Sequence, residues 1–378
     1  MTTSWALSRS LERIGQLCRD VPDDKELRRG VLAELGRMVP FSAFAWPLAD
    51  PESATGIAPM ARIPCPEELP ELIRLKYLTP ACRWTALIGL RRPATTLLME
   101  TGGRPARSPL WSGLLSRYRV TDVLSTVFAD KHGCWGWLDL WRAGDEGTFS
   151  EPETDYLAAA APLVAAGLRR SRAAQCRRDT EGLGGAWPTL RKPLPPQAVL
   201  TLDERLAVVG QTASAGDWLG LLQRGPRPYE GIPAEVLNVA AQLLAREAGV
   251  DPHPAMSRVP VGLGTWALLR STRMEDGRTG TTAPLAVTIQ ECPAAERLEV
   301  FCRCFALTPQ QRRLLGLTAG GLRTAELAAA LRISHYTVQD QFKALFAACG
   351  VRSRSALLGL ALGTAAALPE AGTATGLR

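Results

Sequence analysis

The segment LTPQQRRLLGLTAGGLRTAELAAALRISHYTVQDQFKALFAACGVRSRSALLGLAL, residues 307–362, decides the fold of the C-terminal part of this 378-residue chain. Thr308–Gln311 combine a capping threonine, a proline suited to the first helical position and a glutamine that can reach back to the cap. Thr324 and Ser334 are expected to cap a second and a third helix. Ser353–Leu362 has the pattern of a fourth helix of small residues. The segment therefore predicts a bundle of four short helices.

The third predicted helix has one apolar stripe and one polar face. The stripe consists of Val338, Phe342, Leu345, Phe346 and Cys349, which recur at helical spacing. The opposite face presents Gln339, Asp340 and Lys343, with Tyr336 and Thr337 at its N-terminal end. In a major groove, glutamine can pair with adenine, lysine with guanine, and aspartate can accept from cytosine. This pattern predicts a helix that reads double-stranded DNA.

Positive charge is concentrated in the same segment. Residues 308–363 contain seven basic side chains and only two acidic ones, Glu326 and Asp340. A net charge of +5, out of a formal +7 for the whole chain, therefore lies in about one-seventh of the sequence. Such a concentration is typical of a phosphate-binding surface. Charge alone fits a solvated basic face equally well.

Four motifs in the segment resemble the DNA-binding domain of the LuxR/GerE family. They are Leu-Thr-Pro-x-x-Arg at 307–312, Glu-Leu-Ala at 326–328, Ile-Ser-x-x-Thr-Val at 333–338 and Cys-Gly-Val-x-Ser-Arg at 349–354, and they align without a gap. The resemblance implies an all-α four-helix helix-turn-helix domain. It also implies a homodimer on DNA, because the fourth helix commonly mediates dimerisation in that family.

The resemblance assigns roles to particular residues. Positions matching Gln339, Asp340 and Lys343 contact bases, and those matching Thr324, Ser334, Tyr336 and Thr337 contact the DNA backbone or cap helices. Three departures leave the target sequence open: Gln339 stands where a lysine is common, Asp340 brings a negative charge close to DNA, and Gln341 replaces a common histidine. The alternative is a protein-interaction module whose C-terminal bundle has lost sequence-specific DNA binding.

Residues 1–172 combine helical and strand patterns. A strand is expected at Phe41–Leu48, a hairpin at Asp122–Trp141 and a long alanine-rich helix at Pro152–Arg172. Helices packed on an antiparallel sheet fit this order. The strand, the hairpin with its sequence His132–Gly136, and the closing helix resemble a GAF-like sensor domain of α+β class.

The next part of the chain changes in composition. Residues 173–197 hold several glycines and prolines without an apolar period, which is typical of a linker. Residues 198–292 predict a hairpin at Ala198–Gln211 and then three strands, and this block resembles a second α+β sensor domain, of PAS-like type. The expected organisation is 1–172 GAF-like, 173–197 linker, 198–292 PAS-like, 293–306 connecting helix, 307–365 helix-turn-helix domain and 366–378 flexible tail.

The remaining motifs argue against an enzyme. His132, His253 and His335 are far apart, and nine irregularly spaced cysteines include no Cys-x-x-Cys. The sequence contains no Gly-x-x-x-x-Gly-Lys-Ser/Thr loop and no recognisable Ser/His/Asp set, so we assign no catalytic residue, metal or cofactor. The tryptophans of the first block fit core packing or the lining of a pocket, and the sensor resemblance allows a small-molecule ligand whose contacts the sequence does not assign.

Two further features bear on location. The N-terminus has no basic segment followed by an apolar core, and the apolar runs are too short to cross a bilayer. An odd number of irregularly spaced cysteines indicates a reducing compartment. We therefore expect a cytoplasmic protein without a membrane partner.

Overall fold

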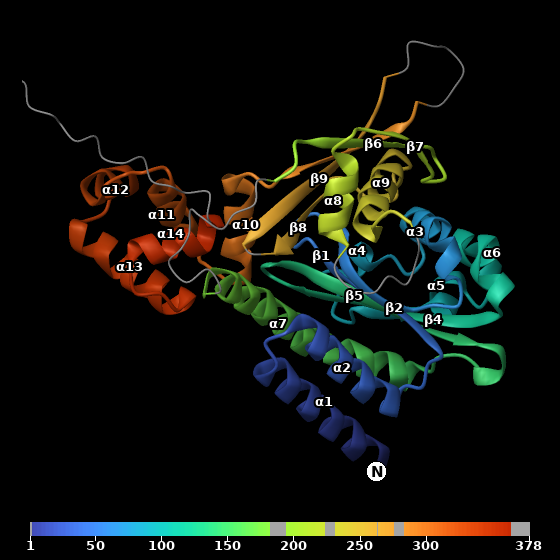
Figure 1. Ribbon diagram of the computed structural model, residues 1–378. Helices are drawn as coiled ribbons and strands as arrows, with labels where there is room; N and C mark the ends of the chain where they lie inside the picture. The colour runs from blue at the N-terminus through green and yellow to red at the C-terminus, as the bar shows by residue number, and fades with distance from the viewer. Residues whose placement is uncertain (1, 182–193, 224–230, 263, 276–282, 364–378) are drawn as a thin grey trace, which may run out of the picture.

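The computed structural model describes residues 2–181, 194–223, 231–262, 264–275 and 283–363. It is a mixed α/β structure in which two five-stranded antiparallel sheets precede a helical C-terminal region (Figure 1). The first sheet has the strand order β2-β1-β5-β4-β3. Its strands are β1 (Ala43–Ala49), β2 (Gly56–Arg62), β3 (Ala94–Thr96), β4 (Val120–Asp130) and β5 (Gly133–Ala143).

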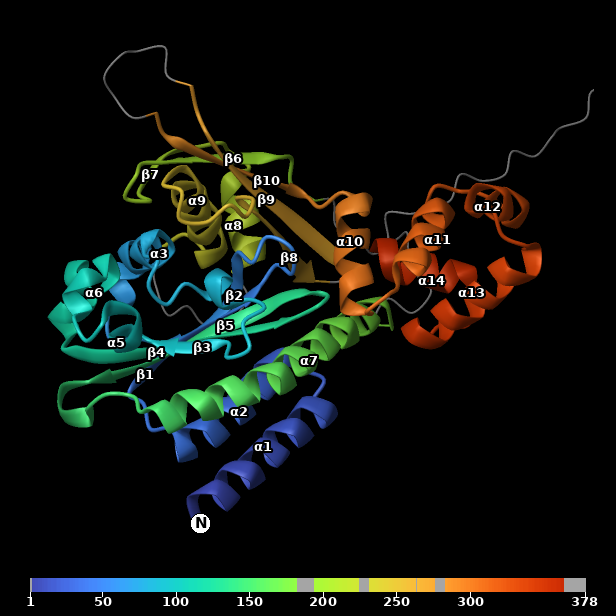
Figure 2. The same ribbon diagram turned by 180° about the vertical axis from the view of Figure 1, so that it is seen from behind.

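Helices cover both faces of the first sheet. On one face α7 (Glu151–Glu181) packs on β4, and α1 (Thr2–Asp20) and α2 (Asp24–Met38) pack on α7 (Figure 2). The other face carries α3 (Leu69–Leu78), α4 (Trp84–Leu87), α5 (Leu97–Thr101) and α6 (Pro109–Gly113). Short 3-10 turns connect these elements: η1 (Pro66–Glu68), η2 (Pro105–Arg107), η3 (Leu115–Tyr118) and η4 (Gly144–Glu146).

The β4–β5 hairpin confirms the predicted pair of strands. Asp130 ends β4, and its carboxylate accepts a hydrogen bond from the His132 backbone at 2.8 Å. Gly133 opens β5 with φ +150°, and a Cβ there would lie 2.3 Å from the Pro51 carbonyl oxygen. Only glycine allows this approach, which explains why the turn occurs at that residue.

The second sheet repeats the connectivity of the first. Its order is β7-β6-β10-β9-β8, so in both sheets the first and last strands of the unit lie side by side at the centre. Its strands are β6 (Ala198–Leu202), β7 (Val208–Gln211), β8 (Met256–Gly262), β9 (Thr265–Arg273) and β10 (Leu285–Glu291), with α8 (Ala215–Leu222) following β7. The predicted hairpin at Ala198–Gln211 and the three later strands are confirmed.

Helix α9 (Ala234–Glu247) joins the two sheets. Every residue from Ala234 to Ala245 is buried, as expected of a helix enclosed on all sides. It packs on α3 and β2 of the first unit and on β8, β9 and β10 of the second. The two sheet units therefore share one helix in their common core.

Buried ion pairs reinforce this junction. Arg258 on β8 forms a bidentate pair with Asp50 after β1, at 2.7 and 2.8 Å, and both side chains are fully buried. Burial by itself raises the pKa of Asp50, but the hydrogen bonds and charge of Arg258 outweigh it and hold that pKa below its ordinary value. Arg83 donates from two nitrogens to one oxygen of Asp251, Oδ2, at 2.6 and 3.0 Å, and this pair is buried too. A pair so buried is costly to break from one side.

One expectation for the sheet region was wrong. The helix predicted to end at Arg172 continues to Glu181, so the first nine residues of the expected linker are helical. Alanine and arginine are good helix formers, and the local absence of an apolar stripe did not stop the helix. Strand β2 begins at Gly56 and pairs with β1 despite Pro59, because it lies at the sheet edge.

The C-terminal region is helical. Its elements are α10 (Ala294–Cys304), α11 (Pro309–Ala319), α12 (Thr324–Leu331), α13 (His335–Cys349) and α14 (Arg354–Leu362). Figures 1 and 2 show α11–α14 gathered at one end of the molecule, next to α10 and the C-terminal end of α7. The expected tail at 366–378 lies outside the described residues.

All nine cysteines are buried. Among the described residues, no three histidine, cysteine, aspartate or glutamate side chains come together as a metal site. In the same part of the chain, no individual helix has the length and apolar composition needed to cross a membrane; α13 and α14 reach that threshold only when counted together across a bend of 53°.

Replacing one partner of the Arg258–Asp50 pair should be strongly destabilising. We expect Arg258→Met to lower the free energy of unfolding by about 3–5 kcal/mol, because it leaves the Asp50 carboxylate buried without its counter-ion. Urea unfolding followed by tryptophan fluorescence measures this loss. The double variant Asp50→Asn/Arg258→Met should recover part of it.

The matched control is Arg270→Met, which removes a half-exposed arginine paired with Glu296 at 2.6 Å. It should cost less than about 1 kcal/mol. Equal losses for Arg258→Met and Arg270→Met would show that the buried pair does not hold the two sheets together.

Candidate nucleic-acid interface

The start of α11 has the geometry that its sequence predicts. Thr308 Oγ1 accepts from the Gln311 backbone N–H at 3.3 Å, and Gln311 Oε1 accepts from the Thr308 N–H at 2.9 Å. This reciprocal pair satisfies two N–H groups that the helix itself leaves unpaired. Leu314, Leu315 and Thr318 then face the core of the bundle.

The expected capping role of Thr324 is wrong. The N-cap of α12 is Arg323, and Thr324 is the first helical residue and half-buried. Glu326 makes the contact that the third helical residue makes in a capping box, because its carboxylate accepts from the Arg323 backbone N–H at 2.6 Å. A glutamate at this position also suits the positive end of the helix dipole.

Helix α13 starts where the sequence predicts. Ser334 is its N-cap and accepts from the Thr337 N–H at 3.1 Å, while the hydroxyls of these two residues lie 2.9 Å apart. The structure thus gives Ser334 and Thr337 a capping role. Tyr336 in the first turn is 81% exposed and points away from the bundle core.

The two faces of α13 differ as expected. Val338, Phe342, Leu345 and Cys349 are buried against the rest of the bundle. Gln339, Asp340 and Lys343 are all exposed and lie together on the outer face of the helix. The structure therefore brings the three expected base-reading residues onto one accessible surface.

Asp340 and Lys343 also bind each other. Lys343 Nζ lies 3.0 Å from Asp340 Oδ1, and both side chains are about three-quarters exposed. An exposed pair of this kind contributes about 0–1 kcal/mol, so a stronger partner can displace it. The pair partly neutralises the lysine that is expected to approach DNA.

The basic residues of this region divide into two groups. Arg312 pairs with Glu299 on α10 at 3.3 Å, and Arg354 stacks over Phe342 and donates to the Leu322 carbonyl. These arginines hold helices together. Arg323, Arg332 and Arg352 are exposed, and so form the part of the basic surface that faces solvent.

The C-terminal end of α13 is held by α7. Gly350 ends the helix with φ +71°, and Arg177 donates to the carbonyls of Cys349 at 3.1 Å and Ala348 at 3.4 Å. A cation at this position complements the negative end of the helix dipole. The sequence prediction missed Arg177 because it placed this residue in the linker. The signal that could have found it is the sequence after Arg172, which continues the helical composition of Pro152–Arg172.

Helix α14 is also tied to the upstream part of the chain. Leu357, Leu358, Leu360, Ala361 and Leu362 are buried, and the helix packs on α10 and α7. Arg297 on α10 donates to the carbonyls of Gly264 and Leu360. A dimer contact through the apolar side of α14 therefore requires that helix to separate from α10.

Comparison with protein-family models gave no match, and no curated protein matches the chain.

Loss of the Arg177 contact should loosen the helical region. In Arg177→Met we expect faster amide hydrogen exchange across residues 345–362, because two helix-terminal carbonyls lose their charged donor. Arg178→Met is the control, because Arg178 lies on the same helix but donates to Pro22 and Gln175. Unchanged exchange in Arg177→Met would mean that packing of α14 alone fixes the region.

Proposed function

We propose that this protein is a transcription regulator of LuxR type, which reads double-stranded DNA by placing α13 in the major groove. The observation that carries the proposal is the exposed row of Gln339, Asp340 and Lys343 opposite a buried apolar stripe. A major groove admits one helix, and a helix with these groups on its free side can bond to base edges.

Two further observations support the proposal. The capped start of α13 at Ser334 leaves backbone N–H groups at an exposed helix end, which is a favourable place for a phosphate. Exposed Arg323, Arg332 and Arg352 add positive charge on the same helical region, as phosphate binding requires. In this proposal Tyr336 and Thr324 lie close to the DNA backbone, and Thr337 caps the helix with Ser334.

The two sheet units serve in this proposal as GAF-like and PAS-like sensor domains. Their support is the antiparallel architecture and the repeated strand order, which fit two related domains in series. The regulator would act in the cytoplasm as a homodimer on DNA and without catalytic activity. A ligand or partner bound to the sheet units would gate DNA binding.

Removing the base-reading side chains should weaken specific binding. The target is first found by in vitro selection of duplexes bound by the full-length protein. Lys343→Ala and Gln339→Ala should then each weaken binding to that duplex by about 5- to 150-fold, as loss of about 1–3 kcal/mol per base contact implies. The salt slope of Lys343→Ala should fall by about one if the ammonium also meets phosphate.

The control for lost charge is Lys25→Ala on α2, an exposed lysine outside the helical region. It should bind like the wild type. Wild-type affinity in both α13 variants would show that α13 does not read the major groove. If selection yields no bound duplex even at low salt, the alternative of a protein-interaction module is favoured; the mutual neutralisation of Asp340 and Lys343 is the observation that supports it.

Asp340 should restrain DNA binding. In Asp340→Asn the Lys343 ammonium loses its partner and a negative charge leaves the interface, so affinity for duplex DNA of any sequence should rise several-fold. Fluorescence anisotropy with a random duplex measures this gain. The gain should be smaller when Asp340→Asn is introduced into Lys343→Ala, because only the removed negative charge then contributes; an equal gain in both backgrounds would show that release of the lysine contributes nothing.

A further inference from the structure

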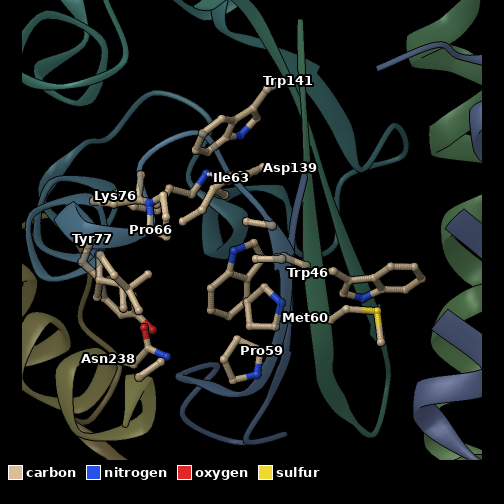
Figure 3. A pocket seen from close by; sticks show the side chains of 18 of the residues that line it. Trp46, Pro59, Met60, Ile63, Pro66, Lys76, Tyr77, Asp139, Trp141 and Asn238 are labelled. Atoms are coloured by element: carbon tan, nitrogen blue, oxygen red, sulfur yellow. Dashed lines mark hydrogen bonds and ion pairs between the residues drawn. The ribbon is translucent and has the colours of Figure 1, made fainter. Parts of the chain in front are cut away.

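A cavity of about 100 Å³ lies between the first sheet, α3 and α9 (Figure 3). Its walls come from both sheet units, because Ala234 and Asn238 of α9 face residues of β1, β2 and β5 across it. A cavity of this size can hold several waters or one ring-sized molecule. The site is therefore large enough for a small ligand.

The lining of the cavity is mostly apolar. Pro59, Met60, Ile63 and Leu72 form much of the wall, and the indoles of Trp137 and Trp141 add flat aromatic surface. Water in such a site finds few hydrogen-bond partners, whereas an apolar ring gains contacts with the wall. The lining favours an apolar guest.

The charged residues in the wall are already neutralised. Lys76 Nζ binds Asp139 Oδ2 at 2.7 Å and donates to the Cys82 carbonyl at 3.1 Å, and Ser125 donates to Asp139 at 2.6 Å. Both members of the ion pair are about nine-tenths buried or more. Since neither charge is free, a charged ligand would be desolvated without a counter-ion.

Two lining residues, Trp46 and Trp141, have a buried indole N–H that forms no hydrogen bond within the described residues. Trp46 packs on Phe128, and Figure 3 shows its indole beside Met60 and turned away from the cavity. The same view places the Trp141 indole at one end of the cavity, next to Ile63 and Asp139. A buried donor without an acceptor is unfavourable, so a ligand that carries one acceptor gains by binding there.

The cavity is coupled to the second sheet unit through an aromatic stack. Trp137 stacks on Trp84 with ring centroids 3.9 Å apart, and the Arg83 guanidinium lies 3.9 Å above the Trp84 ring. Arg83 in turn binds Asp251 and the Gln242 side chain of α9. A ligand that packs on Trp137 is therefore linked, through Trp84 and Arg83, to groups that join the two units.

We propose that this cavity binds a small, uncharged, ring-containing molecule with one hydrogen-bond acceptor, held by the indole N–H of Trp141. Binding itself is independent of the DNA-binding proposal; only the role of this molecule as the signal rests on that proposal.

The experiment uses three probes of similar size with full-length protein and no DNA: acetophenone, ethylbenzene and benzoate. Isothermal titration calorimetry and thermal shift measure binding. Acetophenone should bind about 2- to 10-fold more tightly than ethylbenzene, because only the ketone offers an acceptor, and benzoate should not bind. Absence of binding by both neutral probes, or binding of benzoate as tight as that of acetophenone, would overturn the proposal.

Variants locate the site. Trp141→Phe keeps a ring but removes the N–H, so the preference for acetophenone should vanish while ethylbenzene still binds. Trp266→Phe is the matched control, because Trp266 is a second buried tryptophan whose indole N–H forms no hydrogen bond within the described part of the chain, and it lies outside the cavity. It should keep the preference.

A second variant keeps the test decisive if Trp141→Phe does not fold. Ala61→Leu on the edge strand β2 should fill the cavity and abolish binding of both neutral probes. Retained binding in Ala61→Leu would place the probes elsewhere and overturn the proposal. DNA retardation with and without acetophenone is measured separately, so loss of DNA binding and loss of probe binding are distinguished.

Discussion

Burial of α9 on all sides is the constraint on which the rest of the molecule depends. A helix without a solvent face must be enclosed, and here each sheet supplies part of the enclosure. The ion pairs Arg258–Asp50 and Arg83–Asp251 cross the same junction, where their charges are satisfied only if both units are in place. The two sheets therefore form one packed body, and a change on either side of α9 affects both sheets.

The C-terminal helices are attached to this body from two directions. Helix α10 follows β10 directly and packs on α14, while α7 reaches the same helices from the first sheet. The polar face of α13 with Gln339, Asp340 and Lys343 remains exposed in this arrangement. If the proposed function holds, its DNA-reading surface is free while the adjoining apolar surface of α14 is occupied within the chain.

Local signals in the sequence predicted the helical region well. The capping box at Thr308, the cap at Ser334 and the two faces of α13 depend on residues close in sequence, so their chemistry is visible without a structure. The cap of α12 was predicted one residue too late, because Thr324 is the first helical residue and Glu326 contacts the backbone of the preceding Arg323. The hairpins were predictable for the same reason.

Contacts between distant segments were not predictable. Nothing in the sequence of α9 marks it as a shared core helix. The pairing of Asp50 with Arg258, 208 positions away, produces no periodic pattern in the sequence. The cavity depends on which side chains α9 brings to β2, and Arg177 gains its role only because α13 ends beside it. Such features arise from packing rather than from local pattern.

The length of α7 has a mechanical consequence. Its 31 residues make a rod of about 46 Å at about 1.5 Å per residue, with one end on the first sheet and Arg177 near the other. A tilt of about 5° at the sheet would move the far end by about 4 Å, simply from the length of the rod. That displacement exceeds the reach of a hydrogen bond. A tilt of this size at the sheet would therefore be enough to break the hydrogen bonds between Arg177 and the end of α13.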